Sequence, residues 1–492
     1  MSSEPVEGTF GNWKKPSSPG LFGLGQRATM AGAVCMVVAM VVMLTAGMLV
    51  GIVAVVVSAA VIAAFGIHDR DGLSVADKIG EHMGYAQTMS RGGHIHRGGP
   101  LGTGNFGLPG VGAELSVMEG QDVSGASFVM VVRTNRRRVS VVFGCEPGGF
   151  GSADQDERIA AVASWGSWLN RLGEDTDIVG VQVVVQTAPD TGERLRVAVE
   201  TQIDPDAPPL ARRVLAEIVG STPARAAQVS TWVVVTWKTN SLGRKAGDAA
   251  SLADMLAPRL GGLVGLLRNA CMGQVWLLDG GELAEAVRTA YDPASRSLFD
   301  KARAEGNPIG LSWKDAGPSV ATAAYDWYRH DSAASQTWTA VGAPQGIVTA
   351  NVLTRLLAPG QVPMKRVTLL YTPVEAGAAQ KMVDDDVRAA SASRGTKRGA
   401  DVTSTFAYQQ ANHTAMEVAA GAGLVFFGMI VTATTDDLSE RRQLGETMKS
   451  LGGTARIRLR LAYGCQDAGF VASLPLGVYL ADELTGAKAV LK

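Results

Sequence analysis

The longest apolar run in the chain extends from Ala28 to Gly66. Its 39 residues contain no Asp, Glu, Lys or Arg and are rich in Val, Ala, Met and Leu. A single helix of this length would measure about 58 Å, roughly twice the ~30 Å hydrocarbon core of a lipid bilayer. The run therefore predicts two helices of about 18 residues each, folded back as a hairpin. We expect the turn near Thr45–Gly51, where Gly47 and Gly51 allow a tight reversal.

A lipid bilayer is the expected environment of this hairpin. A secretory signal has an apolar core of only about 7–15 residues, whereas this run is longer and follows a polar flank of 27 residues. Its sixteen Val, Leu, Ile and Phe residues contribute about −5 to −10 kcal/mol of insertion free energy, at roughly −0.3 to −0.6 kcal/mol each, before the cost of its Gly, Thr and Ser residues. The alternative is a buried hairpin in the core of a large soluble protein.

Basic residues lie on both sides of the run and are absent from the predicted turn. The positive-inside rule places such flanks in the cytoplasm. The sequence therefore predicts a plasma (inner) membrane protein with two transmembrane helices, both termini in the cytoplasm and most of its residues on that side. The flanking basic residues are Lys14, Lys15, Arg27, Arg70, Lys78, Arg91 and Arg97.

The remaining pattern divides the chain into six parts. These are a cytoplasmic tail (1–27), the transmembrane hairpin (28–66), a juxtamembrane linker (67–112), a first α+β domain (113–245), a helical middle region (246–345) and a last α+β domain (346–492). The linker is rich in Gly, His, Arg and Pro from residue 91 onward, which suits a loop. The predicted fold class is therefore α+β, with a membrane hairpin followed by mixed α/β domains.

Strands and helices alternate in the first domain and the middle region. The sequence predicts a β-hairpin of Phe128–Val132 and Val139–Phe143, strands at Val179–Thr187 and Ser230–Trp237, and helices at Asp154–Leu172 and Leu210–Val219. Ser152 and Gln155 form a candidate capping box. Five leucines at three- and four-residue spacing predict a buried helix face over Ser251–Ala270, namely Leu252, Leu256, Leu260, Leu263 and Leu267. Residues 294–340 are polar and predict loops.

The last domain has the clearest pattern. It predicts a strand at Val367–Tyr371, a helix at Val374–Ala390, a strand at Leu424–Thr434, a helix at Asp437–Leu451 and a strand at Ala455–Ala462, with a basic loop around Lys397 and Arg398. Strand, helix, strand, helix, strand is typical of a ferredoxin-like split β-α-β unit.

Composition argues against nucleic acid as the main ligand. The chain has 45 Lys and Arg against 46 Asp and Glu, and its pI is near 6.6. Nucleic-acid-binding proteins usually carry a strong basic excess, so no sequence-specific nucleic-acid binding is expected. The cysteines form no CxxC pair and are expected to be reduced packing residues. They are Cys35, Cys145, Cys271 and Cys465.

The sequence nominates no catalytic, cofactor-binding or metal-binding residues. It has no GxxxxGK[ST] phosphate loop, GxSxG or HExxH motif. Asp279 ends an apolar strand, as a magnesium-binding aspartate does in nucleotide hydrolases. Four apolar residues before an aspartate are common by chance, so without a phosphate loop this pattern does not favour nucleotide binding. Gly102–Gly107 matches GxGxxG between loop-forming residues, so it is expected to be a loop. The chain is therefore expected not to be an enzyme and to need no cofactor.

Two polar clusters have competing interpretations. His82, His94 and His96 lie near the membrane segment, where a solvated or headgroup-facing role competes with a metal site that would need further ligands. Arg133–Arg138 suits a solvated hairpin turn, or a contact to anionic lipid or an acidic partner. His330 and His413 have no companions that suggest catalysis. The tryptophans are expected to be mostly in the core.

The N-terminal part resembles an actinobacterial family of type IV secretion or conjugation proteins. The resemblance rests on Gly11–Gly25 (GNWKKPSSPGLFGLG), the two predicted membrane helices and His94–Gly102 (HIHRGGPLG). The membrane part is similar to the PrgI family, whose members are small two-helix secretion components.

The rest of the chain resembles the N-terminal, non-ATPase half of the TraC/VirB-type conjugation ATPase. The most specific segment is Gln466–Gly477 (QDAGFVASLPLG), which is similar to the Q-x-x-A-F-x-x-x-L-P segment that joins this half to the motor domain. Gln466, Phe470, Leu474 and Pro475 match that pattern, whereas Gly469 stands where the family has Ala.

This resemblance implies a non-catalytic membrane scaffold that docks a separate P-loop ATPase, with the four matching residues at the ATPase junction. It also implies other secretion-system membrane subunits as partners and assembly into a homo-oligomer. One alternative is a core membrane component of type VII secretion, which also has two N-terminal membrane helices. Another is a membrane-bound enzyme with an unrecognised site.

Overall fold

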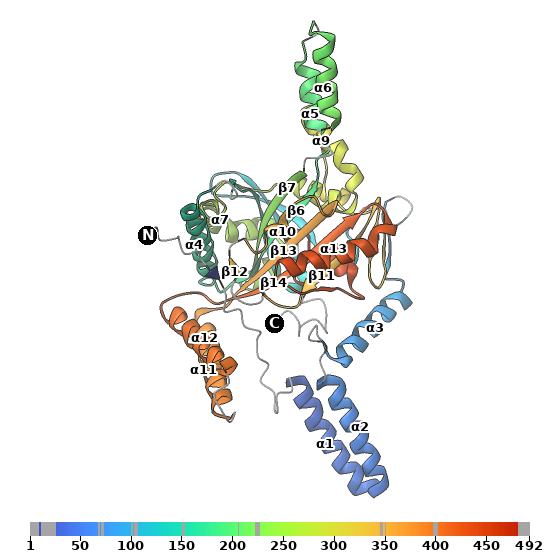
Figure 1. Ribbon diagram of the computed structural model, residues 1–492, viewed down its shortest axis with the longest axis vertical. Helices are drawn as coiled ribbons and strands as arrows, with labels where there is room; N and C mark the ends of the chain where they lie inside the picture. Colours follow the sequence, from blue (N-terminus) through green and yellow to red (C-terminus); the bar gives the residue numbers. More distant parts are fainter. Residues whose placement is uncertain are drawn as a thin grey trace.

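The computed structural model describes residues 9–10, 26–66, 69, 73–99, 102, 107–149, 153–204, 206–221, 227–344, 348–349, 351–396 and 402–480. The central body is built around a large sheet, and pairs of helices project from the body (Figure 1). The N-terminal segment Ser18–Gly25, the loop residues Lys397 and Arg398 and most of the Gly102–Gly107 motif lie outside the described residues.

The described strands pair in antiparallel fashion. The main sheet has 13 strands in the order β2-β9-β10-β11-β14-β13-β6-β7-β5-β4-β3, with β15 paired to β11 and β8 paired to β5. Its strands are β2 (Ile95–Arg97), β3 (Ser116–Gln121), β4 (Ser127–Arg133), β5 (Arg138–Glu146), β6 (Ile178–Pro189), β7 (Ala227–Lys238), β8 (Gln274–Leu277), β9 (Val320–Ala323), β10 (Tyr328–His330), β11 (Ala333–Ala340), β13 (Met364–Pro373), β14 (Val425–Thr435) and β15 (Leu459–Leu461). β1 (Thr9–Phe10) pairs separately with β12 (Val348–Thr349).

Helices lie on both faces of the sheet and beyond its ends. They are α1 (Gln26–Ala46), α2 (Met48–Gly66), α3 (Val75–Ser90), α4 (Gln155–Leu172), α5 (Glu193–Gln202), α6 (Pro209–Ser221), α7 (Ala249–Cys271), α8 (Gly280–Tyr291), α9 (Arg296–Ala304), α10 (Thr354–Leu357), α11 (Ala376–Thr396), α12 (Val402–Ala419), α13 (Arg441–Thr454) and α14 (Gln466–Ala472). The combination of one large sheet with many helices agrees with the predicted mixture of α and β structure.

The sheet is continuous across the three predicted cytoplasmic regions. β13 pairs with β6 over seven residues, from Lys365 opposite Thr187 to Tyr371 opposite Val181. This pairing joins the predicted first and last domains in the centre of the sheet, and β8 to β11 add strands from the predicted helical middle region. These strands therefore share one sheet.

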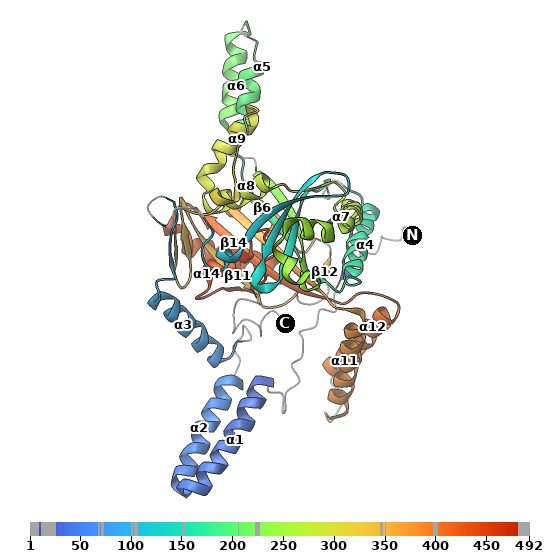
Figure 2. The ribbon, with the colours of Figure 1, turned by 180° about the vertical axis from the view of Figure 1, so that it is seen from behind.

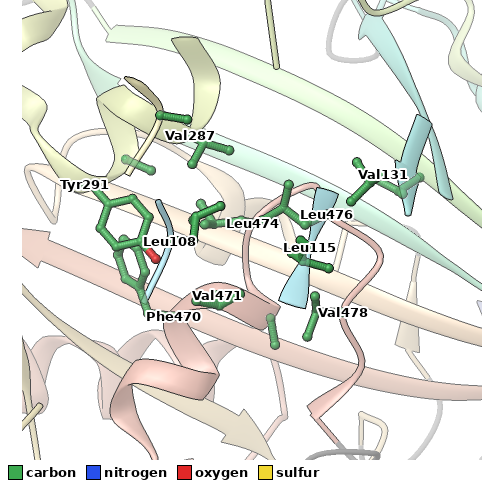
Figure 3. Packing of buried hydrophobic residues seen from close by; sticks show 14 of the residues in the cluster. Leu108, Leu115, Val131, Val287, Tyr291, Phe470, Val471, Leu474, Leu476 and Val478 are labelled. Atoms are coloured by element: carbon green, nitrogen blue, oxygen red, sulfur yellow. The ribbon is translucent and has the colours of Figure 1, made fainter. Parts of the chain in front are cut away.

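Alternation along each strand supplies two cores. In β4, Val129 and Val131 face a core that includes α8 and α14, whereas Phe128 and Met130 face a core that includes α4 and α7. A third cluster packs α13 against β13 and β14. Figure 3 shows the first core, in which α14 and the residues that follow it lie beside α8 and the strands.

The helix α7 shows how periodicity sets burial. All five leucines of the predicted face are buried, and the helix packs onto the sheet beside α4. Asp248 caps its N-terminus by accepting a hydrogen bond from Ser251 N at 3.0 Å. The capping box predicted at Ser152 and Gln155 is wrong by two residues, since Asp154 and Glu157 form it at the start of α4.

Residues 294–340 correct a second prediction. The region was expected to be loops, yet it holds β9, β10 and β11, and every residue of β11 is buried. Most side chains of the strand are small or hydroxylated, and the hydroxyl groups of Ser335 and Thr337 pair with neighbouring strands. Ser335 lies 2.8 Å from His330, and Thr337 lies 3.0 Å from Thr432. A buried strand with such polar side chains has no continuous run of apolar residues, and that run is the pattern from which a buried strand is predicted.

The last region contains a split β-α-β unit. β14, α13 and β15 follow one another in the chain, and β11 lies between the two strands, antiparallel to both. This arrangement agrees with the predicted succession of elements, although β15 covers only Leu459–Leu461 of the predicted strand. Whether the region is ferredoxin-like beyond this unit stays a prediction, because β13 continues the sheet into β6.

Three helical pairs project from the body. The pair α1–α2 and the pair α11–α12, inserted between β13 and β14, project on one side, and α5–α6, inserted between β6 and β7, projects on the opposite side (Figures 1 and 2). Each insertion leaves the sheet pairing intact because its flanking strands are adjacent in the sheet.

Candidate functional site

The segment that resembles an ATPase junction lies inside the body. Gln466, Phe470 and Leu474 are each 0% exposed, and Pro475 is also buried. They belong to α14 and to the residues after it, which pack against α8 and the sheet (Figure 3). These side chains therefore contribute to the core of this chain and do not form part of its outer surface.

Gln466 completes the hydrogen bonding of β11. One edge of β11 pairs with β10 up to Ser335 and with β15 from Trp338 onward. Thr337 lies between these partners, and its N–H donates to Gln466 Oε1 at 2.8 Å. Gln466 Nε2 donates to Thr337 O at 3.2 Å and to Ala462 O at 2.9 Å. The side chain thus satisfies backbone groups that water cannot reach.

Phe470 lies among buried aromatic and charged groups. Its ring centroid is 4.9 Å from that of Tyr291, 5.4 Å from that of Tyr328 and 4.7 Å from that of His330. The Arg366 guanidinium carbon lies 5.3 Å from the ring centroid, which is a cation–π distance. The cluster joins α8, β10 and β13 through one side chain of α14.

Arg366 is the buried cation of this cluster. Its Nε donates to Gln186 Oε1 and its Nη1 to Ser473 Oγ, each at 3.0 Å. Burial lowers the pKa of Arg366 to about 10, since desolvation penalises the charged form. Among the described residues no carboxylate forms an ion pair with it, so neutral acceptors and an aromatic face hold this charge.

His330 is buried in its neutral form. Its Nδ1 lies 2.6 Å from Tyr291 O, a carbonyl oxygen that can only accept, so Nδ1 carries the proton. Nε2 therefore accepts from Ser335 Oγ at 2.8 Å. Burial lowers the pKa of His330 to about 4. The sequence drew attention neither to Arg366 nor to the hydrogen bonds of His330; the partners of Arg366 and the carbonyl partner Tyr291 of His330 lie far away in the chain.

The residues after α14 are bound along the sheet. Gln182 Nε2 donates to Val478 O at 2.6 Å, and Gln182 Oε1 accepts from Gly477 N at 3.0 Å. Gly477 has a φ of +69° and lies against Ser140 and Thr236, so a side chain there would clash. The strap, defined as residues 473–480, thus depends on polar residues of β6 and on a glycine.

The apolar run forms two helices joined at Gly47. α1 ends at Ala46, Gly47 has a φ of +90°, and α2 begins at Met48. Ser58 Oγ donates within its own helix to Ala54 O at 2.7 Å and lies 3.3 Å from Cys35 O of the facing helix. The turn falls within the predicted Thr45–Gly51.

The outer surface of this hairpin is almost wholly apolar. Consecutive residues are exposed, and they point in directions about 100° apart, so the apolar surface extends around each helix. Leu44 and Leu49 near the turn are 77% and 82% exposed. The exposed large side chains are Val34, Met36, Val37, Val38, Met40, Val41, Met43, Leu44, Met48, Leu49, Val50, Ile52, Val53, Val55, Val56 and Val57.

Length and composition identify another helix as the candidate membrane span. Within the part of the chain that the structure describes, α7 is long and apolar enough to cross a membrane, whereas the apolar stretches Gly32–Thr45 and Met48–Ala64 of the hairpin are shorter. The leucine face of α7 packs in the second core. A core helix of a folded body meets the same two criteria, so we assign α7 to the core.

The three histidines nearest the N-terminal hairpin in the chain do not come together with further ligands. His82 lies on α3, where its Nδ1 is 3.0 Å from Tyr325 OH. His94 precedes β2, and His96 pairs with Ala321 of β9. In the described ranges, no group of three or more His, Cys, Asp or Glu side chains is arranged to hold a metal ion.

Asp279 is a helix cap. Its carboxylate accepts from Glu282 N at 2.8 Å, and the Glu282 carboxylate accepts from Asp279 N at 3.1 Å. These reciprocal bonds start α8 and account for an aspartate at the end of an apolar strand.

Arg133, at the start of the predicted solvated turn, is buried and paired with Glu114 at 2.6 Å, whereas residues 134–137 are exposed.

Comparison with known families finds a match in the N-terminal part of the chain. Residues 17–77 match a family described as Domain of unknown function (DUF8461). The matched range covers the hairpin and the first residues of α3. No curated protein matches the chain.

Proposed function

We propose that this chain is a non-catalytic scaffold of a type IV secretion system of the conjugation kind. It sits in the inner membrane through α1 and α2 and docks a separate P-loop ATPase at the cytoplasmic face. The observation that carries the proposal is the apolar hairpin, which stands apart from a folded body whose segment Gln466–Gly477 resembles an ATPase junction. The body supplies a platform, and the motor is a different polypeptide.

The dimensions of the hairpin suit a bilayer. α1 has 21 residues and α2 has 19, which correspond to about 31 Å and 28 Å at 1.5 Å per residue. Both lengths are close to the ~30 Å hydrocarbon core. Soluble monomers rarely expose a contiguous apolar surface above a few hundred Å². Lipid tails would cover this surface, and the basic flanks favour cytoplasmic termini.

The buried strap refines how an ATPase would dock. The strap side chain Leu474 lies in the core, and Gln466 of α14 completes the hydrogen bonding of β11, so both residues support the platform from within. Contact with the motor must then come from outer surfaces of the body or from its projecting helical pairs. In this proposal the matching residues specify the fold to which the ATPase binds, and further subunits and copies of the chain complete the assembly.

Membrane fractionation tests the first half of the proposal. The full-length chain should remain in the membrane pellet after high salt and alkaline carbonate and should dissolve in detergent. Protease added to intact cells should leave its bulk undigested, whereas protease added to inside-out vesicles should digest the body. A chain recovered in the soluble fraction without detergent, or digested from outside, would contradict it.

Purification under mild crosslinking tests the second half. A tagged full-length chain, expressed from its native locus, should recover a protein with a GxxxxGK[ST] phosphate loop and higher-order forms of itself. A variant that replaces the hairpin by an unrelated two-helix membrane hairpin is the matched control, since it keeps the location and the body. Recovery of a monomer without an ATPase would refute the scaffold role.

A further inference from the structure

Helix α3 carries an exposed apolar stripe directly after the hairpin. Val75, Ile79 and Met83 are 48%, 53% and 67% exposed. A four-residue spacing advances the direction of a side chain by only about 40°, so the three lie on one face. No residue of α3 is buried. The stripe is therefore an apolar surface that the body leaves uncovered.

The opposite side of α3 is fixed to the body. Glu81 forms an ion pair with Arg460 of β15 at 2.6 Å, and both side chains are mostly buried. Tyr85 packs edge-on against Tyr325, with 5.4 Å between ring centroids. Relative to Ile79, Glu81 and Tyr85 point more than about 100° away around the helix. The orientation of the stripe therefore follows from the docking of α3.

The position of α3 connects the hairpin to the body. Eight residues separate it from the end of α2, and the Lys78 side chain pairs with Asp69 of the connecting segment at 2.6 Å. Ser74 caps it through a reciprocal capping box with Asp77. Both views show α3 between the hairpin and the body, running across the direction of the hairpin and not along it (Figures 1 and 2).

We propose that α3 lies in the cytoplasmic headgroup layer of the bilayer, with Val75, Ile79 and Met83 inserted among the lipids. This inference rests on the proposed membrane insertion of the hairpin. Continuity with the hairpin places the stripe where the chain leaves the membrane. Three side chains are far too few for a stable protein interface, which buries about 800 Å² per partner, whereas a lipid surface needs no complementary shape.

The arrangement would set the orientation of the body. An interfacial helix lies in the plane of the membrane. The ion pair between Glu81 and Arg460 holds α3 against β15, so the sheet keeps a fixed orientation relative to that plane. The hairpin alone would leave the body free to rotate about the connecting segment. With α3 in the headgroup layer, one edge of the sheet faces the membrane at a fixed angle.

Photo-crosslinking in vesicles tests the inference on the full-length chain. A benzophenone amino acid replaces Ile79 in one variant, Val55 of the hairpin in a second and Val123 of the exposed β3–β4 turn in a third. Val123 is 81% exposed and apolar, so it is the matched control. Each variant is reconstituted in vesicles of phosphatidylcholine and phosphatidylglycerol, irradiated and examined by mass spectrometry for phospholipid adducts.

The result expected is a lipid adduct at position 79 at least about tenfold more abundant than at 123, together with a strong adduct at 55. A lipid adduct at 55 without one at 79 overturns the inference and leaves the membrane hairpin standing. Adducts at neither position overturn both. An adduct of position 79 with another protein chain, or equal lipid adducts at 79 and 123, also overturns it.

Discussion

Replacement of Gln466 by Leu separates a role in the core from a role in partner binding. Leu keeps most of the side-chain volume, so little cavity forms, and the change removes the three hydrogen bonds that link Gln466 to Thr337 and Ala462. The Thr337 N–H then has no partner in the interior. Thr337 O retains the bond from Ala462 N at 2.9 Å, so the main penalty falls on the donor.

The expected magnitude follows from these bonds. An unpaired buried donor costs about 1–3 kcal/mol, and each neutral hydrogen bond contributes about 1 kcal/mol net. Because the carbonyl keeps another partner, we expect a loss of about 2–4 kcal/mol in the free energy of unfolding. The assay is equilibrium urea unfolding of the detergent-solubilised chain, followed by tryptophan fluorescence. The change should appear in the midpoint while the slope stays constant.

A matched control removes a comparable surface bond. Gln380 of α11 donates to Asp384 at 3.1 Å in solvent, so Gln380→Leu should change the free energy of unfolding by less than about 0.5 kcal/mol. If Gln466→Leu were equally mild yet reduced recovery of an ATPase, the reasoning would be refuted. That outcome would assign Gln466 to the partner interface and not to β11.

Three further outcomes are expected. The pKa of His330 is lowered to about 4 in the folded chain, against about 6.5 in the unfolded chain. The contribution of neutral His330 to the free energy of unfolding is therefore complete above pH 6.5 and is lost as the pH falls toward 4. Relative to a His330→Gln variant, urea unfolding should show a decrease of about 3 kcal/mol in the free energy of unfolding over this pH window. Leu256→Ala should lower the free energy of unfolding by about 2–5 kcal/mol because it opens a cavity under α7, whereas Leu298→Ala, at a residue 67% exposed, should change it by less than about 0.5 kcal/mol. A hydrogen bond from Cys145 lowers the pKa of Cys271, so iodoacetamide should modify Cys271 at neutral pH. The Cys145→Ala substitution should slow this reaction, which peptide mass spectrometry would measure. An unchanged rate of modification would contradict the hydrogen bond.

Helix periodicity was the most informative signal in the sequence. The leucine face of α7 could be predicted because five apolar residues recur at helical spacing, and burial of such a face needs only a neighbouring apolar surface. The hairpin turn at Gly47 could be predicted from a bilayer thickness and the residue that tolerates a positive φ. Both inferences use local information alone.

Long-range polar pairing could not be predicted in the same way. β11 consists mostly of small and hydroxylated residues, and its burial depends on partners in β14 and on Gln466, which lies more than a hundred residues later. The partners of Arg366 are Gln186 and Ser473, equally remote in sequence. Such groups become buried only once the register of the sheet is set, so no local pattern identifies them.

The buried strap also changes what mutations can reveal about docking. If the chain is the proposed scaffold, a substitution inside the strap, such as Leu474→Ala, should weaken folding and ATPase recovery together, since the ATPase would bind the platform that the strap completes. A substitution that weakens recovery at unchanged urea midpoint must instead lie on the outer surface. Plotting recovery against midpoint for variants of both kinds therefore separates the two classes. A strap variant that folds normally but loses the ATPase would show that the strap leaves the core to bind it.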